Sequence, residues 1–148
     1  MTEALTFPVS LRDRRPEASG AGTGTATGGV RWLLRAEGLA LFAAATALYP
    51  HFGVSWGWFA LLFLTPDLSF LAYLAGPRWG AVAYNGVHST LLPIALGALG
   101  LVMPSQTLEA LALIVFAHVG LDRALGYGLK YSTAFGDTHL GWFGRDRS

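Results

Sequence analysis

The stretch ALFAAATALYPHFGVSWGWFALLF, which runs from Ala40 to Phe63, contains no Lys, Arg, Asp or Glu. Helices of a soluble bundle carry an apolar stripe on one side and charged residues on the other, and this stretch has no charged side. Pro50 divides the stretch, which indicates that one apolar helix ends there and that another begins a few residues later. The pattern therefore favours two helices in a membrane over two helices in a soluble core.

The same apolar character continues on both sides of this stretch, from Val30 to about Leu129. A helix that rises about 1.5 Å per residue needs roughly 20 residues to cross a hydrocarbon core about 30 Å thick. Four segments approach that length and end near Pro or Gly: residues 31–49, 55–75, 81–103 and 108–129. We therefore predict an all-α fold, an integral-membrane four-helix bundle within residues 30–141.

The two ends of the chain have a different composition from the apolar segments. Residues 1–29 contain no long apolar run and end in a low-complexity stretch of Gly, Thr and Ala, which predicts a flexible, disordered N-terminal tail. Residues 130–148 follow the fourth apolar segment and are predicted to be a C-terminal segment in the cytoplasm.

Composition excludes several classes of function. Charged residues make up 13% of the chain and hydrophobic residues 53%, whereas an average soluble domain has roughly 25% charged residues. The formal net charge is +1, so the chain lacks the basic field that holds nucleic acid, and membrane lipid is the expected partner. The absence of Cys excludes disulfides, thiolate metal sites and thiol nucleophiles.

The basic residues predict the orientation in the membrane. All ten lie before the first apolar segment or at its start, between the second and third, or at and beyond the end of the fourth. The two intervening loops, residues 50–54 and 104–107, contain neither Lys nor Arg. Because loops rich in Lys and Arg stay in the cytoplasm, we expect both termini to be cytoplasmic in a multi-pass protein of the inner (plasma) membrane.

Polar residues occur at similar depths in all four segments, about 8 to 16 Å below the cytoplasmic boundary at 1.5 Å per residue. An isolated charge at the centre of a membrane helix costs roughly 2.5 to 3.5 kcal/mol, so polar groups gathered at one depth are expected to satisfy one another. The candidate polar site consists of Glu37, Asp67, Asn85, His88, His118, Asp122 and Arg123.

Helical spacing supports this convergence. His118 and Asp122 are four residues apart and share one helical face, and Asn85 and His88 are three residues apart. Asp67 follows Pro66, which lacks an N–H group and is expected to kink the second helix beside the acid. Pro93 is expected to bend the third helix in the same way.

Three interpretations of the polar site remain open from the sequence. In a structural one, the acids pair with Arg35, Arg123 or Lys130, and the histidines bond to Asn85, Tyr84 or backbone carbonyls. In a second, Asp67, His88, His118 and Asp122 bind a divalent metal such as zinc and activate water to hydrolyse a lipid-like substrate, with Asp137 and His139 as a lid. In a third, Asp67, His88 and Asp122 form a proton or small-solute pathway.

Small residues mark another face of the fourth segment. Gly120, Ala124 and Gly128 recur at every fourth position and lie away from His118. Small residues allow helix backbones to approach closely in membranes. We therefore expect this face to contact a neighbouring helix or a second protomer, which would make a homo-oligomer.

The C-terminal third carries a family resemblance. The run HVGLDRALGYGLKY from His118 to Tyr131, together with Pro66-Asp67-Leu68-Ser69 and Tyr84-Asn85-Gly86-Val87-His88, resembles the pattern of domain-of-unknown-function family 4260, small bacterial membrane proteins. The resemblance covers about residues 31–141 and implies a multi-span membrane domain. The family has no established activity, so the resemblance assigns no catalytic residue, and it leaves open whether the protein is an enzyme.

Overall fold

The computed structural model describes residues 24–143, which are mainly helical, as the sequence predicts. Most of the predicted N-terminal tail (1–23) and residues 144–148 lie outside the described residues. The elements in chain order are α1 (Gly28–Leu48), η1 (Tyr49–Phe52), α2 (Trp56–Phe63), η2 (Thr65–Ala75), α3 (Pro77–His88), α4 (Leu91–Val102), α5 (Gln106–Leu125), β1 (Asp137–Thr138) and β2 (Gly141–Trp142).

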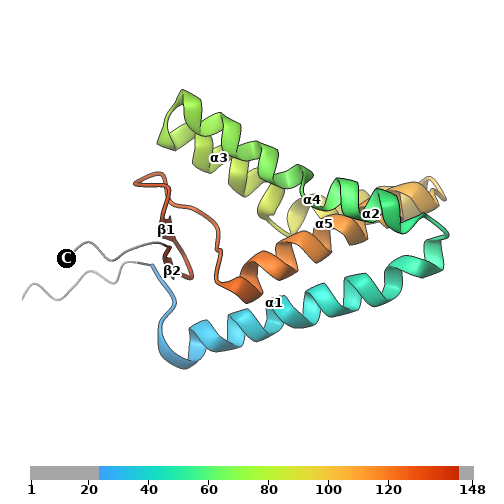
Figure 1. Cartoon of the computed structure of the whole chain (residues 1–148), viewed down its shortest axis with the longest axis horizontal. Helices are drawn as coiled ribbons and strands as arrows, with labels where there is room; N and C mark the ends of the chain where they lie inside the picture. Colours follow the sequence, from blue (N-terminus) through green and yellow to red (C-terminus); the bar gives the residue numbers. More distant parts are fainter. Residues whose placement is uncertain (1–23, 144–148) are drawn as a thin grey trace, which may run out of the picture.

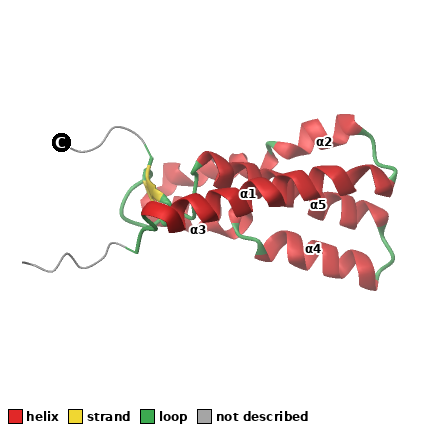
Figure 2. Ribbon diagram, turned by 90° about the horizontal axis from the view of Figure 1, so that it is seen from below, coloured by secondary structure: helices red, strands yellow, loops and turns green. Residues whose placement is uncertain are grey.

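The helices form four antiparallel segments, of which two are broken: α1, then α2 with η2, then α3 with α4, then α5 (Figure 1). Helix α5 is central, because it packs along α1 and lies between α2 and α4 (Figure 2). The small β1–β2 hairpin lies at the end of the bundle where α1 begins. α1 itself begins at Gly28, inside the stretch predicted to be tail.

Both breaks occur where the sequence predicts a bend. The second segment changes from α-helix to 3-10 helix after Leu64, next to Pro66. The third segment is interrupted at Ser89 and Thr90, and its two parts are bent by 40°. Proline cannot donate a hydrogen bond to the carbonyl four residues earlier, and its ring clashes with that carbonyl. For Pro93 this carbonyl belongs to Ser89, which is where the third segment is interrupted.

Length and hydropathy identify one helix in the described residues, Trp56–Ala75, that is long and apolar enough to cross a membrane. A second is found if the bent pair Pro77–His88 and Leu91–Val102 counts as one span. The crossing of a membrane by the whole bundle is therefore a proposal, which we take up below.

Two of the small residues at and beyond the C-terminal part of α5 make close contacts within the chain, and of these two only Gly120 contacts a neighbouring helix. A Cβ atom added to Gly120 would lie 2.6 Å from the Phe42 nitrogen and 2.8 Å from the Gly38 oxygen, both in α1. A Cβ added to Gly128 would lie 2.6 Å from Nδ1 of His139. At both positions, the face considered for a second protomer is thus covered by the same chain.

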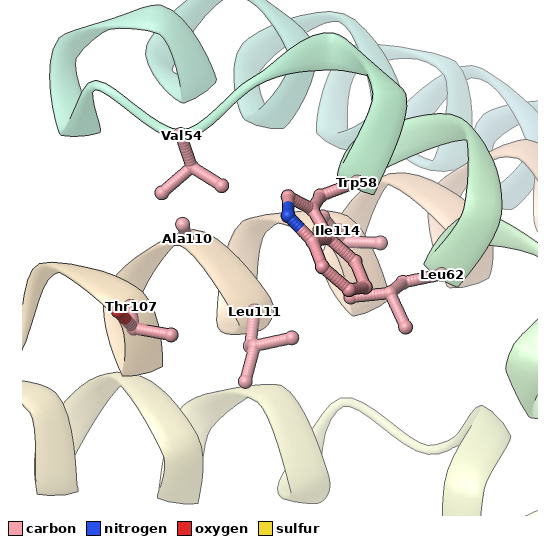
Figure 3. Close-up of a pocket in the computed structure, with 7 residues that line it drawn as sticks. All are labelled: Val54, Trp58, Leu62, Thr107, Ala110, Leu111 and Ile114. Atoms are coloured by element: carbon pink, nitrogen blue, oxygen red, sulfur yellow. The ribbon is translucent and has the colours of Figure 1, made fainter.

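One end of the bundle has an apolar interior, which we call the apolar half; it comprises η1, α2, α4 and the first half of α5. Tyr49, Ala110 and Ile114 form its buried centre. The rings of Tyr49 and Phe59 pack edge to face with centroids 4.9 Å apart. Between α2 and α5 lies a groove of about 410 Å³ (Figure 3). The groove is lined by Val54, Trp58, Leu62, Thr107, Ala110, Leu111 and Ile114.

Candidate metal centre

The other end of the bundle, which we call the polar half, contains a cluster of four side chains: Asp67, His88, His118 and Asp122. Each offers one ligand atom, and these atoms all lie within 4.8 Å of one another. The two histidines are 3% and 2% exposed, whereas the side chains of Asp67 and Asp122 are 36% and 18% exposed. We call these four residues the His/Asp cluster.

The broken helices place these residues. His88 is the last residue of α3, and Asp67 is the third residue of η2, so both breaks bring a polar side chain to the level of His118 on α5. Asp122 lies one helical turn beyond His118, and its Oδ2 is 3.8 Å from His118 Nε2. Irregular backbone between helices is a frequent location of intramembrane binding sites.

The distances between the ligand atoms suit a common central ion. Nε2 of His88 is 3.0 Å from Nε2 of His118, 3.4 Å from Asp67 Oδ1 and 3.5 Å from Asp122 Oδ2. His118 Nε2 is also 3.5 Å from Asp67 Oδ1. Four ligands at about 2.0 to 2.1 Å around a tetrahedral zinc ion would lie about 3.3 Å from each other. The cluster therefore has nearly the dimensions of such a site.

Tyr84 orients two members of the cluster. Nδ1 of His88 lies 3.0 Å from the Tyr84 carbonyl oxygen, which can only accept a hydrogen bond, so Nδ1 is the donor. In a neutral imidazole, this leaves the lone pair on Nε2, the atom that faces the cluster. The Tyr84 hydroxyl donates to Asp122 Oδ2 at 3.1 Å. The Tyr84 ring stacks on the His88 ring, with ring centroids 3.7 Å apart.

The sequence suggests Tyr84 as a possible partner of the histidines but does not indicate this double role. Its second contact, to Asp122 on α5, is a long-range contact that spacing along one helix cannot show.

His118 is held differently from His88. Its ring packs edge-on against Phe63, with centroids 5.3 Å apart. Its Nδ1 is buried and has no hydrogen-bond partner among the described residues. The packing against Phe63 and the hydrogen bond between Nε2 of His118 and Nε2 of His88 together set the direction of the His118 ring.

Within residues 24–143, the ion pairs of Asp67 and Asp122 are made with His88 and His118 and not with Lys or Arg. Arg35, one of the partners considered in the structural interpretation, donates through Nε to the Ala124 carbonyl. Another contact of that interpretation, a histidine bonded to a backbone carbonyl, is formed between His88 and Tyr84.

Two members of the candidate polar site lie elsewhere. Glu37 is exposed on α1 and interacts electrostatically with Arg123 of α5. The structure therefore separates this pair from the four residues of the cluster.

Asn85 joins α3 to the segment that follows α5. Its amide nitrogen donates to the Lys130 carbonyl oxygen at 2.8 Å, and its Oδ1 accepts from the Lys130 N–H at 2.7 Å. We call residues 126–143 the C-terminal cap. Within the cap, His139 Nδ1 accepts from the Leu129 N–H at 2.8 Å, and Asp137 accepts from the Thr133 hydroxyl. Asp137 and His139 thus hold the cap together, and neither belongs to the His/Asp cluster.

A cavity of about 340 Å³, the cap pocket, lies between the cluster and the cap. Its lining consists of Asp67, Phe70, Tyr84, Asp122, Tyr127, Lys130, Phe135 and Phe143. Lys130 is only 5% exposed. Burial lowers the pKa of its ammonium group from the ordinary value, and the Asp122 carboxylate opposes this shift. The sequence suggests Lys130 only as a possible partner of the acids in the structural interpretation, and it does not indicate that the side chain is buried.

The fold and the site together define the class of this protein. It is a helical bundle with a His/Asp cluster at two helix breaks, and a C-terminal cap covers the cluster. The family model described as Domain of unknown function (DUF4260) matches residues 31–143, so the chain belongs to this family. The match includes the whole cluster and the cap, and it confirms the family resemblance seen in the sequence. No curated protein and no solved structure matches the chain.

Proposed function

We propose that this chain is an integral membrane metalloprotein that holds a divalent ion such as zinc in the His/Asp cluster and hydrolyses a lipid-like substrate. The observation that carries the proposal is the convergence of four ligand atoms within 4.8 Å of one another, from three separate helical segments. Imidazole nitrogen and carboxylate oxygen are ligands that zinc and similar divalent ions accept.

Charge and orientation support an ion at this position. Two carboxylates near each other in a half-buried site repel unless a positive charge lies between them. A divalent ion would balance both. The hydrogen bond from His88 Nδ1 to a backbone carbonyl is the second interaction that ligating histidines usually make, and it directs the lone pair of Nε2 toward the cluster.

The chemistry follows from the exposure of the ligands. A bound divalent ion would supply a water whose pKa is lowered to about 7. His88, His118 and Asp122 would hold the ion, and Asp67, the most exposed of the four side chains and part of the lining of the cap pocket, would give up its place on the ion to that water and accept its proton. The water oxygen would attack the ester carbonyl carbon, the bond to the leaving oxygen would break, and this oxygen would take the proton from Asp67. The products are an acid and an alcohol, and water is the only co-reactant.

The distribution of side-chain size supports a membrane environment. Many large apolar side chains point outward, among them Leu74 at 90% and Val102 at 80% exposure. Five buried residues are alanines, namely Ala45, Ala81, Ala110, Ala112 and Ala117. Membrane bundles pack through small residues and present large apolar ones to lipid. We infer four crossings of the inner membrane with both termini in the cytoplasm, as the basic residues predict.

Reporter fusions test this topology. Fusions after Gly29, Arg78 and Ser148 are expected to report the cytoplasm, and fusions within residues 50–54 or 104–107 the opposite side. A cytoplasmic signal from either of these loops would refute four crossings.

Elemental analysis of the detergent-purified chain tests the metal centre. We expect about one divalent ion per chain in the wild type and none in His118→Ala or Asp122→Asn. His51→Ala is the matched control, because His51 is exposed and lies outside the cluster. The loaded wild type, but not His118→Ala, should hydrolyse a short chromogenic ester. Wild-type protein free of metal, with variants that are merely less stable, would assign the cluster a structural role instead.

A further inference from the structure

The proposed function leaves the most buried basic side chain near the cluster, Lys130, without a role. We propose that the cap pocket binds the substrate and that the Lys130 ammonium recognises a singly charged anionic group, a carboxylate or a phosphodiester, close to the bond that is hydrolysed. This proposal rests on the metal centre proposed above. It defines the substrate as an amphiphile with a single negative charge near its scissile carbonyl.

The pocket is placed to hold such a molecule against the cluster. Asp67 and Asp122 belong both to its lining and to the ligand set, so a molecule in the pocket reaches the ion. Its volume of about 340 Å³ lies at the lower end of the range of small-molecule sites. Four of the lining residues, Phe70, Tyr127, Phe135 and Phe143, offer aromatic surface to an apolar part of the substrate.

The Lys130 side chain is held inside an aromatic surround. Its Nζ lies 3.7 Å from the ring centre of Phe135, 4.8 Å from that of Tyr84 and 5.4 Å from that of Phe70. These rings stabilise the cation without neutralising it. Nζ donates one hydrogen bond, to the Phe135 carbonyl at 2.8 Å, whereas an ammonium group has three donors. Because Lys130 also lines the pocket, its charge is available to a bound anion.

The formal charges favour a monoanion. A divalent ion balances the carboxylates of Asp67 and Asp122, and the charge of Lys130 is left over. A neutral ester would leave this ammonium buried without an anionic partner. A dianion would bring one negative charge more than the ammonium can balance. A charge-assisted hydrogen bond in a site shielded from water is expected to favour the anionic ligand about tenfold or more.

The backbone at Lys130 is fixed independently of its side chain, because Asn85 bonds both its N–H and its carbonyl. Replacement of the side chain should therefore leave the cap in place. This makes Lys130→Gln a usable test variant. Arg78→Gln is the matched control, since it removes one exposed basic charge outside the pocket.

The experiment measures binding, so that it does not depend on turnover. Full-length protein in detergent is loaded with Co²⁺, and its visible spectrum is followed during titration with two hydroxamates of equal chain length. Butyrohydroxamic acid is neutral in solution, and succinic monohydroxamic acid adds one carboxylate. A phosphonate monoester analogue of the latter, which also carries one negative charge, distinguishes recognition of carboxylate from recognition of phosphodiester.

We expect wild type and Arg78→Gln to bind an anionic hydroxamate about tenfold or more tightly than the neutral one. Lys130→Gln should lose this preference while it keeps its cobalt content and its affinity for butyrohydroxamate. A failure to bind Co²⁺ at the cluster would refute the metal centre itself. Cobalt-loaded protein with no anion preference, or with equal losses in Lys130→Gln and Arg78→Gln, would refute the role of Lys130 and leave the metal centre standing.

Discussion

Helix α5 passes through both halves of the bundle and serves each in a different way. In the apolar half it presents Ala110 and Ile114 to Tyr49. One turn beyond Ile114, in the polar half, it presents His118 and Asp122 to side chains from η2 and α3. In the apolar half the contacts are mainly between apolar and aromatic side chains, with one hydrogen bond from the Tyr49 hydroxyl to the Ser55 carbonyl. In the polar half, four ionisable side chains meet instead.

The cavities of the two halves also differ in the polarity of their lining. Among the described residues, the groove of the apolar half is lined by no charged side chain, and its polar groups are the Thr107 hydroxyl and the Trp58 indole N–H. The cap pocket of the polar half is lined by two carboxylates and an ammonium group. Apolar grooves accept many occupants, whereas convergent charged groups select one. The proposed binding chemistry therefore concerns the polar half.

The largest difference between the halves is expected when metal is removed. An ion present at about a thousandfold its Kd stabilises a protein by about 4 kcal/mol, or about 10 °C in Tm for a chain of this size. A chelator should therefore lower the Tm of the wild type by about 10 °C and leave that of His118→Ala unchanged. Ile114→Ala should lower the starting Tm yet keep the full chelator shift. An equal shift in His118→Ala would locate the ion outside the cluster.

A smaller difference is expected from removing one tyrosine hydroxyl in each half. Tyr84→Phe keeps the ring on His88 but removes the donor to Asp122, so metal affinity should fall about ten- to hundredfold. Tyr49→Phe removes the donor to the Ser55 carbonyl and should lower stability by about 1 kcal/mol without changing metal affinity. Competition with a chromophoric chelator measures both affinities. Similar affinities in the two variants would contradict the role of Tyr84.

The smallest effect concerns the cap that covers the polar half. Burial lowers the pKa of His139 below its ordinary value of 6.5, so the unfolded chain binds the proton more readily than the folded one. The burial of neutral His139 therefore contributes to the free energy of unfolding above pH 6.5, and this contribution is lost as the pH falls through the pKa of His139 in the folded protein.

In metal-free protein, Tm should therefore fall from pH 7.5 to pH 5 by a few degrees more in wild type than in His139→Asn. Asparagine offers a comparable acceptor to the Leu129 N–H but does not titrate in this range. Parallel pH profiles for the two proteins would show that His139 is not the titrating group.

Much of the helical organisation could be predicted from the sequence, because it depends on local properties. Apolar runs bounded by Pro and Gly predict segments that end within a few residues of the observed helices. The bends near Pro66 and Pro93 follow from the missing N–H group. The family was identified from short polar motifs, and the matched residues 31–143 agree with that resemblance.

The candidate site was only partly accessible to sequence reasoning. Depth along each helix groups His118 with Asp67, but it also groups them with Glu37, because depth does not show which way a helix is rotated. The structure places Glu37 on the exposed surface of α1. The burial of Lys130 could not be predicted, since it depends on how the cap folds back over α3 through Asn85. Such contacts between distant parts of the chain leave no periodic pattern.

The two hydrogen bonds between Asn85 and Lys130 join residues that are 45 positions apart, and this has a consequence for the order of events during synthesis. All four cluster residues precede Lys130, so the ribosome has made every ligand before the hydrogen bonds between Asn85 and Lys130 can form. At about 5 to 20 residues per second, the remaining cap is added within a few seconds. An ion that enters in this interval would be enclosed by the closing cap, and its later escape would be governed by how often the cap opens.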